Sequence, residues 1–407
     1  MKLELSYLNH TTQALIKTAN QVIGELKLHG YEAYIVGGAV RNLLLGEEVN
    51  DIDITTDCLP KNIIKIFDKT VPVGIEHGTV IVLWQDFQFE VTTFRVDGEY
   101  IDHRRPEQVQ FVTDLKSDLE RRDFTINALA LSETYEIIDY FDGQKDLKNK
   151  EIRAVGNAAH RFEEDALRMM RAIRFQSVLN FNIETNTLHA IDKLAATIAL
   201  VSIERIVVEL KKLLMGKGVH QALQIFYKTM YCYLPFFRDI KENTATYQLH
   251  SPVNFVVYIA YIIYCELKVG QDLTSKISDF KLSNQEKKQI KDCVLIFDFF
   301  NHSEISLKAF VYRFDIDLIQ SVYHFILNEK IVFNNIVDIS SILNAKQQLP
   351  IQTRDELQID GNVLMTNLDK KPGPWLKSMI NNIELAVIEG RLSNRQENIL
   401  EWAKNHV

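Results

Sequence analysis

The sequence predicts an α+β fold, in which a small mixed sheet with a few helices is followed by an all-helical remainder. Two observations carry this prediction. Over roughly the first 150 residues, short alternating or β-branched runs typical of strands are mixed with segments of helical spacing. From about Arg161 onward, apolar residues recur at helical spacing almost without a break.

The elements of the first part are expected in close succession. An amphipathic pattern predicts a helix first, and a short apolar run that ends at two glycines follows it. In order, the pattern predicts a helix over Asn20–Leu28, the apolar run Tyr34–Val36, a helix over Ala39–Leu45, a strand over Asp51–Thr55, a helix over Pro60–Phe67, and strands over Thr79–Trp84 and Gln88–Phe94. The polar stretch Arg95–Leu119 has no clear period and is long for a passive connection, which predicts a functional loop.

The rest of the chain reads as helix after helix. Proline or serine stands at the expected start of the last two. The predicted helices are Phe162–Leu179, Ser202–Met215, Val219–Met230, Pro252–Val269, Asn284–Phe299, Ser306–Tyr312, Leu318–Asn328, Pro374–Glu389 and Ser393–Asn405.

Composition narrows the class of protein. Hydrophobic residues make up 46% and charged residues 25%, as in an ordinary globular protein. The cysteines are far apart, with no CxxC pair, which argues against a zinc site and fits a reducing cytoplasm. The N-terminus lacks the apolar segment of a secretory signal and no apolar stretch is long enough for a bilayer, so no membrane association is expected. A net charge of −8 argues against coating nucleic acid by bulk charge, so RNA contacts should come from local basic stripes.

The sharpest local feature is a pair of glycines followed by a pair of aspartates. Asp51 and Asp53 are two positions apart in an expected strand, which would place both carboxylates on one face. Such a pair favours a hard cation between its members, and Mg²⁺ with substrate phosphates is the natural choice. Gly37 and Gly38 stand where a strand passes into a helix, where backbone N–H groups can approach a phosphate, and Arg41 lies one turn further.

Either half of this feature alone is more often a tight turn or a solvated acidic strand. A second Asp-Ile-Asp, at Asp315–Asp317, lacks the glycines and lies among helices, so it is interpreted as structural. The complete string of strand, glycines, basic helix and acidic strand is what distinguishes the first pair.

With its context, the string GGAVRNLLLG…NDIDITT resembles the signature of polymerase-β-like nucleotidyltransferases. More narrowly, it is similar to class II CCA-adding enzymes and bacterial poly(A) polymerases. Four further blocks occur in the order found in that family, together covering roughly residues 30–215. They are Arg121–Ala128 (RRDFTINA), Asp139–Leu147 with Ile152-Arg153, Glu164–Arg168 (EDALR) extended by Arg171, Arg174 and Phe175, and Ser202–Arg205 continuing to Glu209-Leu210.

The block Arg121–Ala128 begins with a cluster of charges that is also compatible with a solvated helix start. Beside a metal site, Arg122 can grip triphosphate oxygens, and Asp123 can accept a hydrogen bond from a ribose 2′-hydroxyl. Asn127 lies one turn further and would support the same site.

In the block Glu164–Arg168 and its extension, charged residues recur at every third position. This spacing would keep Asp165, Arg168, Arg171 and Arg174 on one side of a helix. Taken alone, this is most often a salt-bridged exposed face. The resemblance implies that the Asp and Arg of this block, with Glu164 beside them, read the Watson–Crick edge of the incoming base. Cytosine and adenine both carry an amino group next to a ring nitrogen, so one side-chain pair would accept these two bases and reject guanine and uracil.

Two weaker features accompany these blocks. Glu90 lies on the next expected strand, as a third carboxylate near the metal or as an ordinary edge-strand residue. The stretch Gly98–Leu119, which includes Asp102, His103, Arg104 and Arg105, resembles the family's flexible loop, which is implicated in the final addition of A. This resemblance argues against a truncated enzyme that adds only CC.

The resemblance implies a polymerase-β-like head (residues 1–150), a neck that recognises the base (151–217), a helical body (218–305) and a tRNA-binding tail (306–407). The expected activity is template-independent addition of CCA to tRNA from CTP and ATP, with Mg²⁺ as cofactor and release of pyrophosphate, in the cytoplasm. Enzymes of the same architecture that add only CC, only A or poly(A) remain alternatives. A poly(A) polymerase usually has a strongly basic C-terminus, and the last 38 residues here total only +2. A non-catalytic RNA-binding protein with a relic head is the alternative outside this class, and a homodimer is left open.

Overall fold

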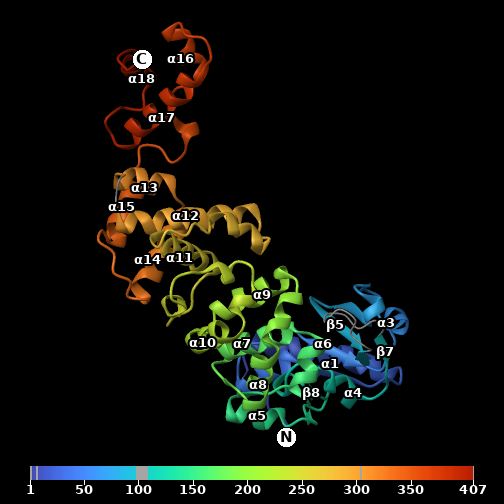
Figure 1. Ribbon diagram of the computed structural model, residues 1–407. Helices are drawn as coiled ribbons and strands as arrows, with labels where there is room; N and C mark the ends of the chain where they lie inside the picture. The colour runs from blue at the N-terminus through green and yellow to red at the C-terminus, as the bar shows by residue number, and fades with distance from the viewer. Residues whose placement is uncertain (1, 6–7, 98–108, 303–304, 407) are drawn as a thin grey trace. The chain divides into compact units, whose positions relative to one another are not determined.

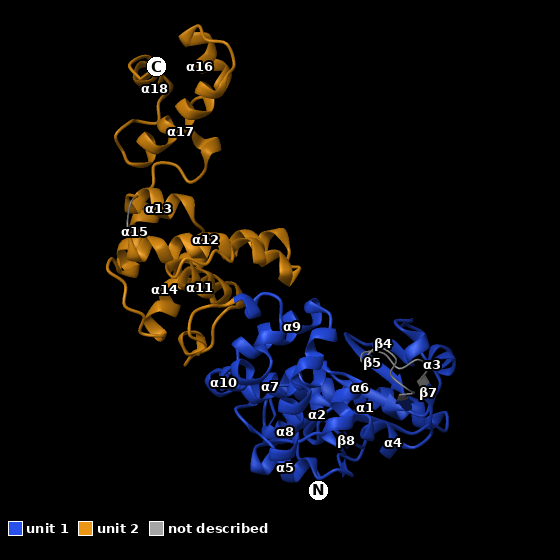
Figure 2. Cartoon of the chain, viewed as in Figure 1, with its two compact units in different colours: residues 1–239 blue, residues 240–407 orange. Residues whose placement is uncertain are grey.

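The computed structural model describes residues 2–5, 8–97, 109–302 and 305–406. The chain divides into two compact units, Met1–Asp239 and Ile240–Val407, which Figure 2 colours separately. Within the described ranges, none of the helices combines the length and the apolar character that a membrane crossing requires.

The first unit is built on a seven-stranded sheet (Figure 1). The strand order is β3-β4-β5-β2-β1-β8-β9, and β2 and β5 are paired in parallel, whereas the other neighbours are antiparallel. The strands are β1 (Ala33–Val36), β2 (Asp53–Thr56), β3 (Thr70–Val71), β4 (Thr79–Trp84), β5 (Phe87–Thr93), β8 (Leu129–Leu131) and β9 (Ile137–Asp139). The predicted α+β class with a small mixed sheet is confirmed.

Five α-helices accompany the sheet over the described part of residues 1–150. Helix α1 (His10–Leu28) begins ten residues before the predicted start, because Asn9 caps it through Thr12 N–H at 2.7 Å. Helix α2 (Gly38–Leu45) follows β1 directly, as the glycine pair predicted. The other helices here are α3 (Pro60–Ile66), α4 (Leu115–Glu120) and α5 (Gly143–Asn149), with a 3₁₀ turn η2 (Thr125–Asn127).

The predicted loop after β5 contains regular structure at both ends. Strands β6 (Arg95–Asp97) and β7 (Val109–Phe111) pair antiparallel, and α4 follows. Asp102, His103, Arg104 and Arg105, which belong to the predicted flexible loop, lie outside the described residues.

The prediction of one helix over Phe162–Leu179 is wrong in one respect. The segment is divided into α6 (Ala158–Glu164) and α7 (Leu167–Leu179), because Asp165 takes an extended conformation with φ −139° and ψ 102°. Its carboxylate accepts a hydrogen bond from Leu167 N–H at 3.1 Å, which satisfies a free donor at the start of α7. Helices α8 (Thr185–Leu194), α9 (Ile203–Leu214) and α10 (Val219–Thr229) complete the unit, with the short parallel pair β10 (Glu151–Ile152) and β11 (Asn182–Ile183).

The second unit is all-helical over its described residues, as predicted. Most helix bounds agree with the sequence pattern to within a few residues. Helix α18 begins at Gln396, three residues after the predicted start at Ser393. The helices are α11 (Phe255–Lys268), α12 (Asn284–Asn301), α13 (Leu307–Arg313), α14 (Ile316–Asn328), α15 (Ile339–Gln347), α16 (Gly361–Leu368), α17 (Pro374–Ile388) and α18 (Gln396–Lys404). The second Asp-Ile-Asp is structural here, because Asp315 caps α14 by accepting from Asp317 N–H at 2.9 Å.

One close backbone approach holds α7 beside the turn between α9 and α10. A Cβ on Gly216 would lie 2.3 Å from the Ser177 hydroxyl and 2.4 Å from the Ser177 carbonyl carbon. That hydroxyl is itself buried and donates to the carbonyl of Leu213 at 2.5 Å. No side chain fits between these segments, so glycine is required at residue 216.

We therefore expect Gly216→Ala to lower the free energy of unfolding by about 2 kcal/mol, because backbone must move to admit the methyl group. Gly24→Ala is the matched control. Gly24 lies inside α1 with no atom within 4 Å of an added Cβ, so the same change should stabilise the protein by about 0.5 kcal/mol. Thermal unfolding measures both, and a Gly216→Ala protein that unfolds at the wild-type temperature would contradict the packing argument.

Candidate active site in the first unit

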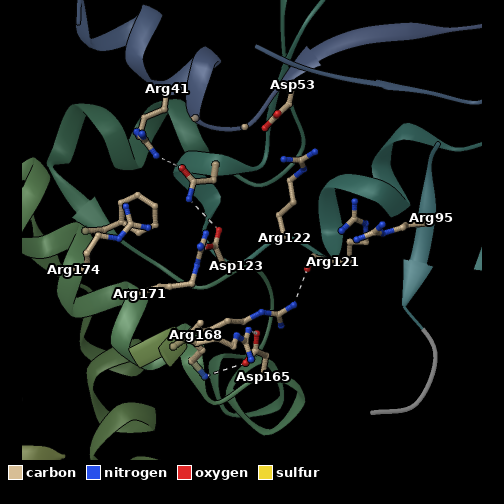
Figure 3. A pocket seen from close by; sticks show the side chains of 16 residues that line it. Arg41, Asp53, Arg95, Arg121, Arg122, Asp123, Asp165, Arg168, Arg171 and Arg174 are labelled. Atoms are coloured by element: carbon tan, nitrogen blue, oxygen red, sulfur yellow. Dashed lines mark hydrogen bonds and ion pairs between the residues drawn. The ribbon is translucent and has the colours of Figure 1, made fainter. Parts of the chain in front are cut away.

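A cavity of about 560 Å³ opens between the sheet and helix α7, within the range typical of ligand sites. Arginines dominate its wall. Figure 3 shows Asp53 and Arg41 on one side of the cavity, and Asp165 and Arg168 on the opposite side. Its lining consists of Gly37, Gly38, Arg41, Asp53, Arg95, Arg121, Arg122, Asp123, Asn127, Asp165, Leu167, Arg168, Arg171, Arg174, Phe175 and Arg205. Eight arginines against three aspartates make this a site for an anion.

Asp53 opens strand β2 and is exposed, whereas Ile52 before it is buried, with an exposed fraction of 2%. Asp51 is also exposed, but the prediction that it shares a strand with Asp53 is wrong, because β2 begins only at Asp53, and Asp51 does not line the cavity. On the parallel neighbour β5, Glu90 is the direct register partner of Asp53. Although the residue is exposed, the cavity wall around its carboxylate removes part of the surrounding water; this desolvation, followed by the charges of Glu90 and then Asp51, raises the pKa of Asp53 to about 6, despite the opposing effect of Arg122. Three carboxylates are therefore near one another at this end of the sheet.

The glycine pair keeps the cavity floor open. Gly37 has φ +74°, and a Cβ there would lie 3.0 Å from Nη1 of Arg122 and 3.8 Å from Oδ2 of Asp53. A side chain at this position would be strained and would also displace the arginine. The glycine thus leaves the N-terminus of α2 and the Arg122 guanidinium facing the same space.

A chain of hydrogen bonds connects Arg41 with helix α7. Arg41 donates to the side-chain oxygen of Asn127 at 2.5 Å, and Asn127 donates to Oδ1 of Asp123 at 3.0 Å. The other oxygen of Asp123 accepts from Nε and Nη2 of Arg171 at 2.8 and 2.5 Å. Burial alone would raise the pKa of Asp123, but Arg171 and Asn127 outweigh it and lower the pKa to about 2.

Arg41 differs from the other cations in its surroundings. Its hydrogen-bond partners within the described residues are the neutral amides of Asn42 and Asn127. Burial, and next the charge of Arg174, lower its pKa to about 10, so the guanidinium stays charged at neutral pH. Its charge is therefore available to an anion that enters the cavity.

Asp165 lies in the break between α6 and α7, not on the helix face that the spacing predicted. Its Oδ2 accepts from Nη2 of Arg205, on α9, at 2.8 Å. Arg168, which is 8% exposed, donates to the carbonyl of Arg121 at 3.0 Å and to Glu164 at 2.5 Å. Glu164 does not line the cavity but instead holds Arg168 from behind, together with an ion pair to Arg161.

Phe175 lies among three guanidinium groups at one end of the cavity. The Cζ atoms of Arg174, Arg41 and Arg171 are 3.6, 5.1 and 5.7 Å from its ring centroid. Glu209 on α9 accepts from Nε of Arg174 at 2.8 Å, so a buried carboxylate balances part of this charge.

The structure therefore brings most of the sequence-predicted residues to one cavity and leaves Asp51, Glu90 and Glu164 off its wall. It also adds residues that were not predicted as site residues. Arg95, Arg121 and Arg205 line the cavity, and Asp118 and Glu209 bind its arginines from outside. The spacing of Asp118, three and four residues before Arg121 and Arg122, was the available signal for that contact.

Comparison with known proteins places this geometry in a family. Residues 33–153 match the family described as the poly A polymerase head domain, residues 180–231 an RNA- and SrmB-binding site of polymerase A, and residues 257–403 tRNA nucleotidyltransferase domain 2. The CCA-adding enzyme of Staphylococcus epidermidis is 41% identical over 401 residues, covering 97% of this chain and 98% of that protein. The chain belongs to the CCA-adding enzyme family.

A second relative in sequence and a solved structure are also similar to this chain. The CCA-adding enzyme of Staphylococcus haemolyticus is 43% identical over 404 residues, with 97% of this chain and 98% of that protein covered. The crystal structure of the Bacillus stearothermophilus CCA-adding enzyme in complex with CTP is 33% identical and aligns with a TM-score of 0.84, over 96% of this chain and 97% of that one. The predicted family, the α+β fold and the nucleotidyltransferase class are confirmed, whereas the roles of single residues in this CCA-adding enzyme stay predictions.

The Asp123 carboxylate offers a test of the electrostatics. Because its native pKa lies near 2, below the ordinary 3.8, its ionised form stabilises the fold above pH 3.8, and this contribution is lost as the pH falls toward 2. We expect Asp123→Asn to lower the free energy of unfolding by about 2 kcal/mol at pH 7, and by less at pH 3.

Urea unfolding of the two proteins at both pH values measures the difference. Asp86→Asn, on the exposed turn between β4 and β5, is the control and should leave stability nearly unchanged. A wild-type advantage that is as large at pH 3 as at pH 7 would contradict the assignment to the ionised carboxylate.

Proposed function

We propose that the arginine-lined cavity adds C, C and A in turn to the 3′ end of tRNA, using CTP and ATP and releasing pyrophosphate. Membership of the CCA-adding family over nearly the full chain supports this reaction. The observation that carries it is the placement of Asp53 opposite a wall of arginines, across a cavity of nucleotide size. We place the reaction in the cytoplasm.

We propose that Asp51 and Asp53 hold Mg²⁺. The raised pKa of Asp53 supports this assignment, because burial and neighbouring carboxylates disfavour its charged form, and a cation would relieve that cost. Within the described residues, no set of three or more His, Cys, Asp or Glu side chains is positioned to hold a metal. Mg²⁺ commonly takes one or two carboxylates plus substrate phosphates, so the two aspartates with a bound triphosphate would supply its ligands. When bound, the ion would polarise phosphoryl oxygens and neutralise their charge.

The triphosphate would lie between the start of α2 and two arginines. The missing side chains at Gly37 and Gly38 leave room for a phosphate beside the first turn of α2, and Arg41 contributes a guanidinium whose hydrogen-bond partners among the described residues are amides. Among the described residues, the buried Nε of Arg122 has no hydrogen-bond partner, and a phosphate oxygen that reached it would satisfy it. Held in this way, the α-phosphate would face the tRNA 3′-hydroxyl, which attacks it while pyrophosphate leaves.

Asp123 has less free capacity than the sequence suggested. All four of its acceptor positions are already used, by Phe124 N–H, Asn127 and two donors of Arg171. Contact with a ribose hydroxyl therefore requires it to release a donor. We propose that Arg171 turns toward the nucleotide when the ribose binds, with Arg174 supporting the same charge balance.

We propose that Asp165 and Arg168 read the incoming base. Each already has a hydrogen-bond partner that fixes it: Arg205 for Asp165, and Glu164 with the Arg121 carbonyl for Arg168. A carboxylate that accepts from an exocyclic amino group beside an arginine that donates to a ring nitrogen suits cytosine and adenine. Guanine and uracil present a carbonyl where the amino group is needed.

In this division of labour, residues 1–150 form the catalytic head and 151–217 the neck, with 218–305 as body and 306–407 as the tRNA-binding tail. The cavity would lie between the head and the neck, because its wall combines residues of β2 and α2 with residues of α7 and α9.

Replacing either proposed metal ligand should stop nucleotide addition. We expect Asp51→Ala and Asp53→Ala each to lower kcat by roughly 10³-fold or more, because charge neutralisation of the phosphates is lost. The second Asp-Ile-Asp supplies a matched control, since Asp315→Ala removes only a helix cap and should cost about 1 kcal/mol of stability with activity retained. Incorporation of labelled CTP and ATP into tRNA lacking its CCA end, with Mg²⁺ present, measures the effect, and normal addition by Asp53→Ala would refute the metal assignment.

Base selection is tested with each nucleoside triphosphate supplied singly and then together. The wild type should add C, C and A to tRNA that ends at the discriminator base, whereas a CC-adding, A-adding or poly(A)-forming enzyme gives a different product. We expect Asp165→Ala to reduce the preference for CTP over UTP by about 10- to 100-fold, because the acceptor for the amino group is removed. Glu163→Gln, an exposed neighbour off the cavity wall, should retain the wild-type preference. Unchanged selectivity in Asp165→Ala would exclude this residue as a base reader.

A further inference from the structure

Asp118 is a fully buried carboxylate that lies behind the cavity and does not line it. It belongs to α4, one turn before the arginine pair Arg121 and Arg122. A buried carboxylate is costly unless its oxygens are satisfied, so its contacts indicate what it is there to hold.

Both oxygens of Asp118 accept hydrogen bonds, and the two shortest come from Arg121. Oδ1 accepts from Nε and Nη2 of Arg121 at 3.1 and 3.0 Å. Oδ2 is 3.5 Å from Nη2 of Arg122 and 3.3 Å from the hydroxyl of Thr55, two residues after Asp53 on β2. The backbone N–H of Arg95, where β6 begins, donates to Oδ1 at 3.3 Å.

This arrangement solves a problem that the arginine pair creates. Two consecutive guanidinium groups repel each other, and Arg122 in particular is buried, which lowers its pKa. A carboxylate behind both groups offsets the repulsion and leaves their outer N–H donors directed into the cavity. Nη1 of Arg122, for example, faces the space beside Gly37 and Asp53.

We propose that Asp118 is a positioning residue for nucleotide binding, which holds Arg122 in the orientation that grips the triphosphate and fixes Arg121 beside it on the cavity wall. The inference rests on the proposed function of the cavity. Asp118 would act on the nucleotide only indirectly, through these arginines. Its replacement should therefore weaken the binding of CTP and ATP and leave the binding of tRNA unchanged.

The test compares Asp118→Asn with the wild type in CCA addition and in direct CTP binding by the free protein. An amide places N–H donors against Thr55 or the arginines, so their orientation is lost. We expect the KM for CTP and ATP and the Kd for CTP to rise about tenfold, with the KM for tRNA and kcat within about twofold. Asp118→Glu keeps the charge but displaces it by one methylene, so its KM should lie between the two, and it serves as the test if Asp118→Asn does not fold.

Thr56→Val is the matched stability control. Thr56 is fully buried on the same strand as Thr55, but its hydroxyl bonds to the carbonyl of Glu32 and to Cys58 N–H, away from the arginines. The Thr56→Val substitution should lower the unfolding temperature without changing the KM for CTP.

Wild-type CTP affinity in Asp118→Asn would overturn the inference. So would a rise in KM that Thr56→Val reproduces for an equal loss of stability, since the carboxylate would then act only on the fold. Failure of the wild type itself to extend tRNA is a separate outcome, which would refute the proposed function instead.

Discussion

The structure depends on balancing a high density of positive charge around one small cavity. Guanidinium groups packed this closely repel one another, so each arginine needs an acceptor that fixes it without using the face it turns inward. Carboxylates that lie outside the wall fulfil this requirement, one of them half-buried (Glu164) and one buried (Glu209). Glu164 holds Arg168, and Glu209 holds Arg174. The acidic residues of the head and neck therefore shape the cavity as much as the basic ones, which explains how a protein of net charge −8 can contain a strongly cationic site.

Much of the fold and of the site could be predicted from local pattern. The strand that ends at Gly37, the helix that follows and the acidic strand all carry short-range signals, because glycine and alternating apolar residues constrain the backbone within a few positions. Family resemblance then indicated which charged residues meet. The structure places Arg41 and Arg122 on the cavity wall, and their places follow directly from the elements that contain them.

The parts that could not be predicted depend on contacts distant in sequence. The break at Asp165 interrupts a segment whose spacing is helical throughout, and it is stabilised by Arg205, 40 positions away. The parallel pairing of β2 with β5, which makes Glu90 the partner of Asp53, likewise follows from the sheet order and not from either strand alone. The sequence indicated that Asp123 could meet a ribose hydroxyl, but not that Arg171 and Asn127 already occupy its acceptors.

The hydrogen bond from Arg168 to the carbonyl of Arg121 ties helix α7 to the backbone of the arginine pair. A purine carries its pairing edge farther from the sugar than a pyrimidine does. With this tie intact the base-reading side chains would keep their place, so the sugar of ATP would have to lie farther from them than the sugar of CTP.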